Sequence, residues 1–211
     1  MSEASIYRLL EIPWIFRLQR KLLAPGGDRA FIRKITSLQE QLPAARMLLD
    51  VGCGPASWLF GVGEHPLGLD RSLSYVQEYV ERGERAVVGS AGGLPFRSGR
   101  FDGVWSIGLL HHLPDDVAAA AVQEMLRVCR PDGYVVVLDA VMPRRAWRRP
   151  LAYALRRLDR GRFVRSESAL RNLFPPQLNW RSDRFTFAAT GLEALVLWAR
   201  RDQGDQFRAV R

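Results

Sequence analysis

A carboxylate and two glycines follow a short apolar run in the segment MLLDVGCGPASW, residues 47–58. Glycine adopts backbone angles closed to other residues and leaves no side chain in the way, so Gly52 and Gly54 can let a ligand lie against the main chain. The carboxylate of Asp50 can attract a positively charged part of that ligand, directly or through water. A strand-to-helix turn without a ligand is the alternative. The dinucleotide fingerprint G-x-G-x-x-G does not fit, because Ser57 stands at the third glycine position.

Two adjacent histidines, His111 and His112, are the candidates for proton transfer. Histidine titrates near neutral pH, so either ring could take a proton from an acceptor that must lose one, such as a hydroxyl. His111 is the first candidate for such a base. The alternative is that the sequence LHHL only packs and caps. His65 precedes an expected strand and is interpreted as a loop residue.

The elements that must position these residues alternate between strands and helices. Apolar runs predict strands at 47–51, 67–70, 86–88, 101–107 and 134–138, with helices at about 73–80 and 115–130. This alternation indicates an α/β fold with a doubly wound, mostly parallel sheet and helices on both faces. Ligands bind beyond the carboxyl ends of such strands. The fifth run, YVVVL, is apolar throughout and is expected to be central.

Helices are expected before this sheet and a hairpin after it. Residues 4–24 form an apolar helical pattern interrupted at Pro13, and Asp28 is expected to cap a second helix that ends before Pro43. Residues 184–188 and 194–199 are expected to pair as an antiparallel hairpin on the sheet. We interpret the chain as a single domain with five parts: an N-terminal helical cap (1–44), a ligand-binding core (45–140), an arginine-rich insert (141–182), a hairpin (183–201) and a polar tail (202–211).

Four motifs, in order, resemble class I S-adenosylmethionine-dependent methyltransferases. They are Asp50-x-Gly52-x-Gly54 with Ala56 where a further glycine often stands, the acid Asp70 in GLD, residues 89–113, and residues 125–139. They cover about residues 45–140. The chain is most similar to the small-molecule branch that includes ubiquinone-biosynthesis-type, or methyltransferase type 11, enzymes. The resemblance implies a Rossmann-like fold, S-adenosylmethionine as cofactor, and methyl transfer to oxygen or carbon of a small or lipid-like acceptor in small-molecule biosynthesis.

The resemblance also assigns cofactor contacts to positions of this chain. Gly52 and Gly54 would border the methionine part, with Asp50 beside them. Asp70 would contact the ribose. Arg71, Ser90 and Ala91 would lie at the adenine. Ser106 and Ile107 would lie beside the methionine part. Many relatives have Asp where this chain has Ser90, so the contact with the adenine amine would lack charge. Together with Ala56, this departure leaves open a non-catalytic partner protein.

The positive charge is concentrated in one segment. Between Arg144 and Arg165 there are nine arginines and one acid, Asp159, so this segment holds nearly all of the net charge of +9. An amphipathic helix with a solvated basic face is one interpretation. The functional ones are attraction of an anionic acceptor, contact with an anionic membrane surface, and binding of RNA. RNA methylation or binding ranks below the others, because no recognisable RNA module accompanies the segment.

Cysteine usage and hydropathy predict the setting. The two cysteines, Cys53 and Cys129, lack metal-ligand spacing, so we expect no metal and a reducing, cytoplasmic location, with membrane contact only at the periphery. No apolar run approaches the ~20 residues that span a bilayer. Cys53 is expected to fill space in the glycine turn, and Cys129 to lie in the core on the helix at 115–130. The sequence carries no signal for an oligomeric state.

Overall fold

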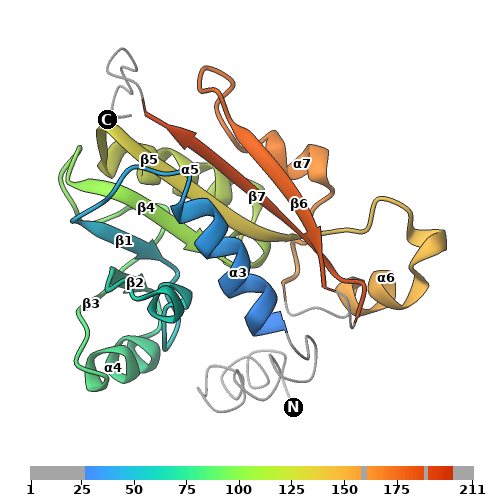
Figure 1. Ribbon diagram of the computed structural model, residues 1–211, viewed down its shortest axis with the longest axis horizontal. Coiled ribbons are helices and arrows are strands. Elements are labelled where there is room, and N and C mark those ends of the chain that lie inside the picture. The colour runs from blue at the N-terminus through green and yellow to red at the C-terminus, as the bar shows by residue number, and fades with distance from the viewer. Residues whose placement is uncertain (1–26, 158–160, 188–189, 202–211) are drawn as a thin grey trace.

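The computed structural model describes residues 27–157, 161–187 and 190–201. They form a seven-stranded sheet in the order β3-β2-β1-β4-β5-β7-β6 (Figure 1). Strands β1 to β5 are parallel, whereas β7 pairs antiparallel with both β5 and β6. This confirms the predicted mostly parallel sheet with a C-terminal hairpin. The bounds are β1 Leu48–Val51, β2 Leu67–Asp70, β3 Ala86–Val88, β4 Phe101–Ile107, β5 Cys129–Val141, β6 Arg181–Thr186 and β7 Glu193–Arg200.

Helices cover both faces of the sheet. One buried cluster joins Val122 of α5 and Leu170 of α7 to the strands, and a second joins Ile35 of α3, Leu59 of η1 and Ala152 of α6 to the opposite face. Helix α4 packs beside β2 and β3. The helical elements are α3 Gly27–Gln39, η1 Trp58–Val62, α4 Leu73–Glu81, η2 Leu110–His112, α5 Asp115–Val128, η3 Ala146–Arg148, α6 Pro150–Arg157 and α7 Glu167–Arg171, where η marks a 3₁₀ helix.

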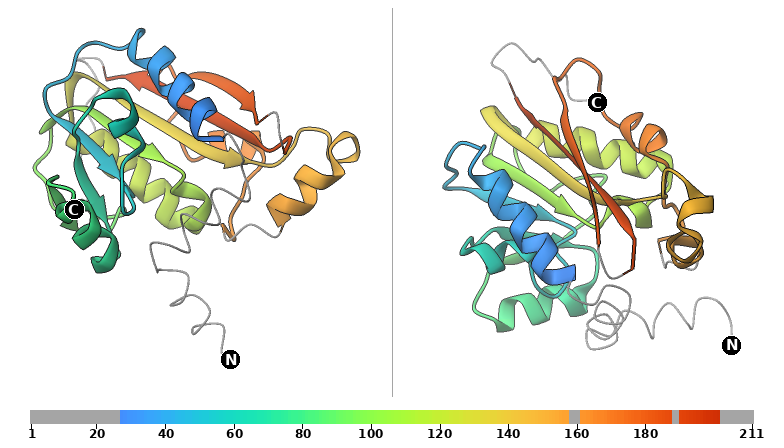
Figure 2. Two further views of the ribbon diagram at one scale, coloured as in Figure 1. Left: turned by 60° about the horizontal axis from the view of Figure 1, so that its bottom comes forward. Right: turned by 45° about the vertical axis from the view of Figure 1, so that its right-hand side comes forward.

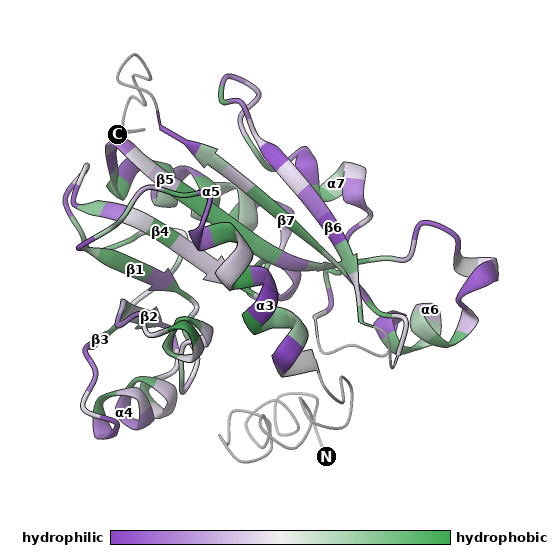
Figure 3. Ribbon diagram, viewed as in Figure 1, coloured by the Kyte–Doolittle hydropathy of each residue, from purple (hydrophilic) through white to green (hydrophobic). Residues whose placement is uncertain are grey.

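The central strands are apolar on both sides because helices cover both. Along β5, Val135 and Val137 pack into the cluster with α5, whereas Tyr134 and Val136 pack into the cluster with α3. This is the two-residue alternation of a strand. Figure 3 shows the resulting band of hydrophobic residues through the middle of the sheet. The run YVVVL therefore lies in an interior strand, as predicted.

The junction of α5 and β5 differs from the prediction. Helix α5 ends at Val128, and β5 begins at Cys129 rather than at Tyr134. Pro131 and Gly133 cannot continue the helix, and Cys129 pairs with Phe101 of β4. Cys129 is buried as expected, but it lies in a strand.

Smaller differences concern two helices. Helix α3 begins at Gly27, so Asp28 lies in its first turn rather than before it. In α4 the buried residues are Val76 and Tyr79, whereas Leu73 and Val80 are exposed. The expected helix at 4–24 lies outside the described residues. Among residues 27–157, 161–187 and 190–201, no helix is both long and apolar enough to cross a bilayer.

The arginine-rich insert projects beyond the end of the sheet. It carries η3 and α6, which stand away from the strands in both views of Figure 2. Arg165 holds the segment that follows α6 against the core. Its buried guanidinium donates to the carbonyls of Leu110 and Leu113, both at 2.7 Å, and pairs with Asp115. Arg156 is buried as well. The insert is therefore not a uniformly solvated basic face, because two of its arginines hold the structure together.

The turn inside β5 should tolerate no side chain at Gly133. A Cβ there would lie 2.7 Å from the carbonyl oxygen of Asp102 and 2.9 Å from that of Arg130, and these backbone atoms cannot give way. We expect Gly133→Ala to lower the free energy of unfolding by about 1–3 kcal/mol in urea titrations. Gly93→Ala is the matched control, because a Cβ at Gly93 meets no atom within 4 Å. Equal stability of the two variants would contradict this account of the turn.

Candidate active site

The carboxyl ends of β1 to β5 open into a cavity of about 1200 Å³. In a doubly wound sheet this edge is where ligands bind, because the strand order reverses there. Ten of the predicted site residues line this cavity: Asp50, Gly52, Gly54, Asp70, Arg71, Ser90, Ala91, Ile107, His111 and His112. Ser106 is not among the residues that line it.

The glycine turn after β1 leaves an open cradle. Gly52 and Gly54 have φ angles of 76° and 60°, which favour glycine. A Cβ at Gly52 would lie 2.8 Å from the side chain of Leu109, whereas one at Gly54 would meet nothing within 4 Å. Gly52 is therefore needed for close packing. Gly54 exposes bare main chain to the cavity, against which a ligand can lie.

Asp50 places an incompletely satisfied carboxylate at the base of this cradle. It is only 2% exposed. Its Oδ2 accepts a hydrogen bond from Ser57 Oγ at 2.6 Å, whereas Oδ1 has no hydrogen-bond partner among the described residues. Burial, with a smaller contribution from the charge of Asp70, raises the pKa of Asp50 to about 7, against the lowering effect of the Ser57 hydrogen bond. A cationic ligand group beside Oδ1 would favour the ionised form.

Asp70 closes the turn from the tip of β2. Its Oδ2 accepts from the N–H of Gly54 at 3.0 Å, and its Oδ1 accepts from the N–H of Ser72 at 2.9 Å. Burial raises the pKa of Asp70, and these N–H bonds partly offset the rise. Each carboxylate oxygen has a second lone pair, so Asp70 can still accept hydrogen bonds from ligand hydroxyls.

The end of β3 and the start of the loop after β2 form the outer rim of the cavity. Ser90 and Arg71 are exposed there, beside the half-buried Ala91. The hydroxyl of Ser90 accepts from the N–H of Gly92 at 3.3 Å and so caps its own turn. Its proton can still be donated to a ligand.

At the end of β4 the two predicted residues separate. Ile107 lines the cavity. Ser106 is fully buried and donates to the carbonyl of Val51 at 3.0 Å, which ties β4 to the end of β1. Its place is beneath the cavity, because side chains alternate along a strand.

Cys53 is held as a neutral thiol. Its side chain is buried, and burial, with the charges of Asp50 and Asp70, raises the pKa of Cys53 far above its ordinary value. Nucleophilic chemistry needs a thiolate, so the thiol fills space in the glycine turn.

His111 is paired with a buried carboxylate that the sequence interpretation missed. Asp139, at the end of β5, is 1% exposed and contacts His111 Nδ1 through its Oδ1. Its Oδ2 accepts from the backbone N–H of His111 at 3.1 Å. Burial acts to raise the pKa of Asp139, but the charge and hydrogen bonding of His111 outweigh it and hold the pKa below its ordinary value. An ionised Asp139 favours the tautomer with the proton on Nδ1.

Aromatic side chains form part of the cavity lining. Phe31 of α3 stacks on Trp58 of η1 with ring centroids 4.6 Å apart, and its ring centroid lies 5.2 Å from that of Phe187. All three line the cavity, together with Leu155 of α6. Arg156 also lines it, and its buried guanidinium donates to the carbonyl of Glu193 at 2.8 Å. These aromatic and apolar side chains offer a large contact surface to a ligand.

The missed residues lie far apart in sequence. Phe31 lies in α3 and Trp58 in η1, whereas Phe187 follows β6, and no local pattern joins them. Asp139 did carry a signal, because it directly follows the apolar run YVVVL, just as Asp70 directly follows the apolar residues of the second strand. Among the described residues, no group of three His, Cys, Asp or Glu side chains could hold a metal ion.

Fold and site together define a doubly wound α/β protein that binds a ligand at its strand tips. Residues 49–137 match the family described as "Methyltransferase domain". A solved S-adenosylmethionine-dependent methyltransferase from Thermotoga maritima, described as a possible histamine N-methyltransferase, has a TM-score of 0.71 at 14% identity, over 93% of this chain and 100% of that one, which supports the fold. Residues 49–137 therefore resemble a methyltransferase domain in sequence, and the described residues share the fold of a solved methyltransferase.

Curated relatives match about half of the chain. A tRNA (carboxymethyluridine(34)-5-O)-methyltransferase of Arabidopsis thaliana is 32% identical over 109 residues, which are 49% of this chain and 26% of that protein. A demethylmenaquinone methyltransferase of Shouchella clausii is 34% identical over 125 residues, 53% of this chain and 52% of that protein. The chain therefore spans about a quarter of the first relative's length and about half of the second's. These names cover two kinds of acceptor.

The residues present fit S-adenosylmethionine. The open main chain at Gly54 leaves room for a ligand, and the unsatisfied Oδ1 of Asp50 suits the cationic methionine part. The second lone pairs of the Asp70 oxygens suit ribose hydroxyls.

The raised pKa of Asp50 predicts pH-dependent cofactor affinity. Below about pH 7 the buried carboxyl of the empty protein is mostly protonated, and it must lose that proton to attract a cation. We expect affinity for S-adenosylmethionine to rise between pH 6 and 8, with protons released on binding at the lower pH. Calorimetry in buffers of different ionisation enthalpy measures this release. In the Asp50→Asn variant the protons released by the protein on binding should disappear. An unchanged pH dependence of affinity in that variant would contradict the role of Asp50.

Proposed function

We propose that this protein transfers a methyl group from S-adenosylmethionine to oxygen or carbon of a small, apolar or lipid-like acceptor, with His111 as the general base. The observation that carries the proposal is one continuous cavity. It is lined by the glycine turn, by His111 and by the aromatic side chains of Phe31, Trp58 and Phe187. The match of residues 49–137 to a methyltransferase domain supports the reaction type.

Most of the catalytic work falls to positioning. S-Adenosylmethionine supplies an activated methyl group on a sulfonium. The cradle at Gly54 and the carboxylates of Asp50 and Asp70 hold the cofactor, and the aromatic side chains orient the acceptor. Orientation of this kind contributes on the order of 7–11 kcal/mol in favourable cases. The apolar lining excludes water, which would otherwise compete with the acceptor.

The acceptor must lose a proton when a hydroxyl or an acidic carbon is methylated. His111 can accept that proton at Nε2, because Asp139 holds the ring by Nδ1 and compensates the charge that forms. Asp139 is therefore a positioning residue. The guanidinium of Arg156, which lines the same cavity, favours an acceptor with a carboxylate, a phenolate or an enolate.

Removal of the base should slow turnover without loss of cofactor. With an acceptor found by screening for a mass gain of one methyl group, we expect His111→Ala to lower kcat by roughly 10²–10⁴-fold. Affinity for S-adenosylmethionine, measured by calorimetry, should stay within about twofold, because the change leaves the cradle intact. Asp139→Asn should lower kcat less and shift its pH profile. His65→Ala is the control, since His65 pairs with Glu84 away from the cavity.

The outcomes separate the parts of the proposal. Full activity of His111→Ala with a hydroxyl acceptor would rule out the base but leave methyl transfer standing. Cofactor binding without turnover of any acceptor would instead favour a non-catalytic partner protein, which the replacement at Ser90 left open. No heat of binding with S-adenosylmethionine would contradict the whole proposal.

Methylation of RNA is the second candidate. The observation that favours it is the 32% identity to a tRNA methyltransferase over half of the chain. An RNA enzyme should bind tRNA with an affinity that falls steeply with salt, since each neutralised phosphate steepens the dependence. Filter binding between about 50 and 200 mM salt measures this slope. Absence of a complex at low salt would exclude the RNA candidate and leave the small acceptor.

A further inference from the structure

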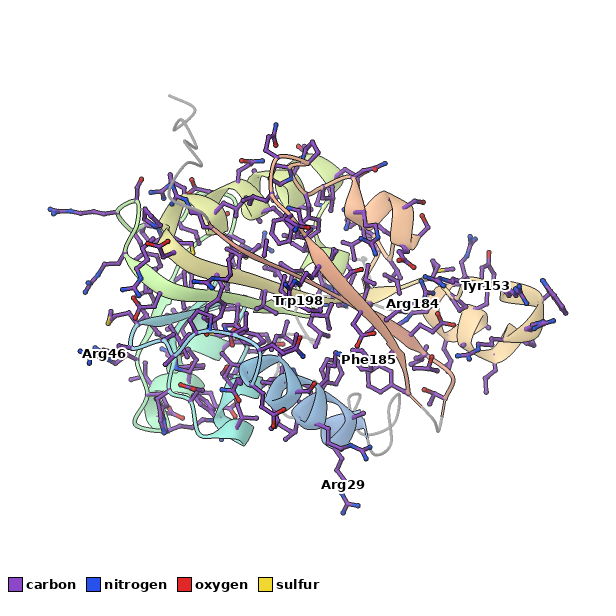
Figure 4. All side chains as sticks on the ribbon, turned by 45° about the horizontal axis from the view of Figure 1, so that its top comes forward. Arg29, Arg46, Tyr153, Arg184, Phe185 and Trp198 are labelled. Atoms are coloured by element: carbon purple, nitrogen blue, oxygen red, sulfur yellow. The ribbon has the colours of Figure 1, made fainter. Side chains whose placement is uncertain are left out.

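Exposed apolar side chains gather on the insert. Among the described residues, four large hydrophobic side chains of this segment face solvent: Trp147, Leu151, Tyr153 and Phe163. Trp147 is 74% exposed and Leu151 63%. Figure 4 places Tyr153 on the part of the molecule that projects beyond the sheet. Single exposed apolar residues are ordinary, but a cluster on one projecting element marks an interaction surface.

One side of helix α6 faces the cavity and the other faces solvent. Ala152 and Arg156 are buried and Leu155 is half-buried, so these three side chains share one face of the helix. Leu155 and Arg156 also line the cavity. Leu151 and Tyr153 are exposed on the two flanks of this face, and Arg157 is exposed on the far side. The helix therefore separates the cavity from the surface that carries the exposed apolar side chains.

Arginines surround these apolar side chains. Arg145, Arg148, Arg157 and Arg162 are exposed, and Arg148 lies 4.7 Å from the ring centroid of Trp147. Arg144 and Arg149 form ion pairs with Glu167 and Glu193 at the base of the insert. The sequence holds no acidic residue from Arg144 to Arg157. The outer face is therefore both apolar and positively charged.

We propose that this outer face of η3 and α6 docks on an anionic membrane surface. Aromatic and leucine side chains enter the headgroup region, and arginines pair with lipid phosphates, which is the chemistry of interfacial helices. RNA would use the arginines and could stack on the aromatic rings, but it offers no partner for Leu151. The docked face backs onto Leu155 and Arg156 in the cavity. If the acceptor is lipid-like, as in the function proposed above, it would pass beside α6.

Vesicle cosedimentation tests the docking without cofactor or acceptor. We expect the full chain to sediment with vesicles of phosphatidylcholine mixed with phosphatidylglycerol, and not with phosphatidylcholine alone. The double variant Arg145→Glu, Arg148→Glu should lower the partition coefficient at least about tenfold, since each surface arginine contributes to attraction. Trp147→Ala should also lower it severalfold. Because Trp147 is 74% exposed, the thermal shift of the Trp147→Ala variant with S-adenosylmethionine should equal that of the wild type.

Matched controls separate local docking from general charge. Arg97→Glu, Arg100→Glu makes the same change in net charge at exposed positions outside the insert, and Val80→Ser removes an exposed apolar side chain of α4. Both should retain vesicle binding within about twofold. Equal loss in the controls, or no sedimentation with anionic vesicles, would overturn the proposal. So would tRNA binding that depends on Arg145 and Arg148 while vesicles fail to bind. Each of these results leaves the cofactor-binding and turnover experiments to judge methyl transfer separately.

Discussion

The hydrogen bond from the N–H of Gly54 to the carboxylate of Asp70 ties the turn after β1 to the tip of β2. The bond holds the open cradle in place together with the N–H groups of Gly52 and Cys53, which donate to the carbonyl of Leu69 at 2.7 and 3.1 Å. The parallel order of the strands brings a third acid, Asp139, to the same edge. Three strand-end carboxylates thus serve one cavity, and their different partners decide what each can do.

The chemistry of the three acids follows from what satisfies them. Asp70 is held by backbone N–H groups on both oxygens, so it is a fixed acceptor. Asp139 is satisfied by His111, and its pKa is held low. Asp50 has a raised pKa and one oxygen without a partner in the described structure. This combination is typical of a carboxylate that binds a cationic ligand group. The three aspartates at neighbouring strand ends therefore have three different roles.

The sequence could predict what is local. The strands at 67–70, 86–88 and 101–107 have the predicted bounds, because apolar runs between turn residues carry that signal. The glycine turn could be identified from its residue types, and Asp70 from the resemblance to class I methyltransferases. The pairing of His111 with Asp139 and the stacking of Phe31 on Trp58 could not, because they join residues that only the tertiary fold brings together. At Cys129 a helical pattern was overridden by pairing with Phe101, and at Ser106 strand alternation turned the side chain away from the cavity.

The charges of the cavity also favour an order of binding. With Asp50 ionised and no cation beside it, a buried negative charge would face the space that an anionic acceptor must enter. A bound cationic cofactor offsets that charge. The guanidinium of Arg156 then remains to attract an anion. Since the unsatisfied acid and the arginine line one cavity of about 1200 Å³, occupation of the cofactor half strengthens the attraction in the acceptor half. Cofactor first and acceptor second is the order that these charges favour.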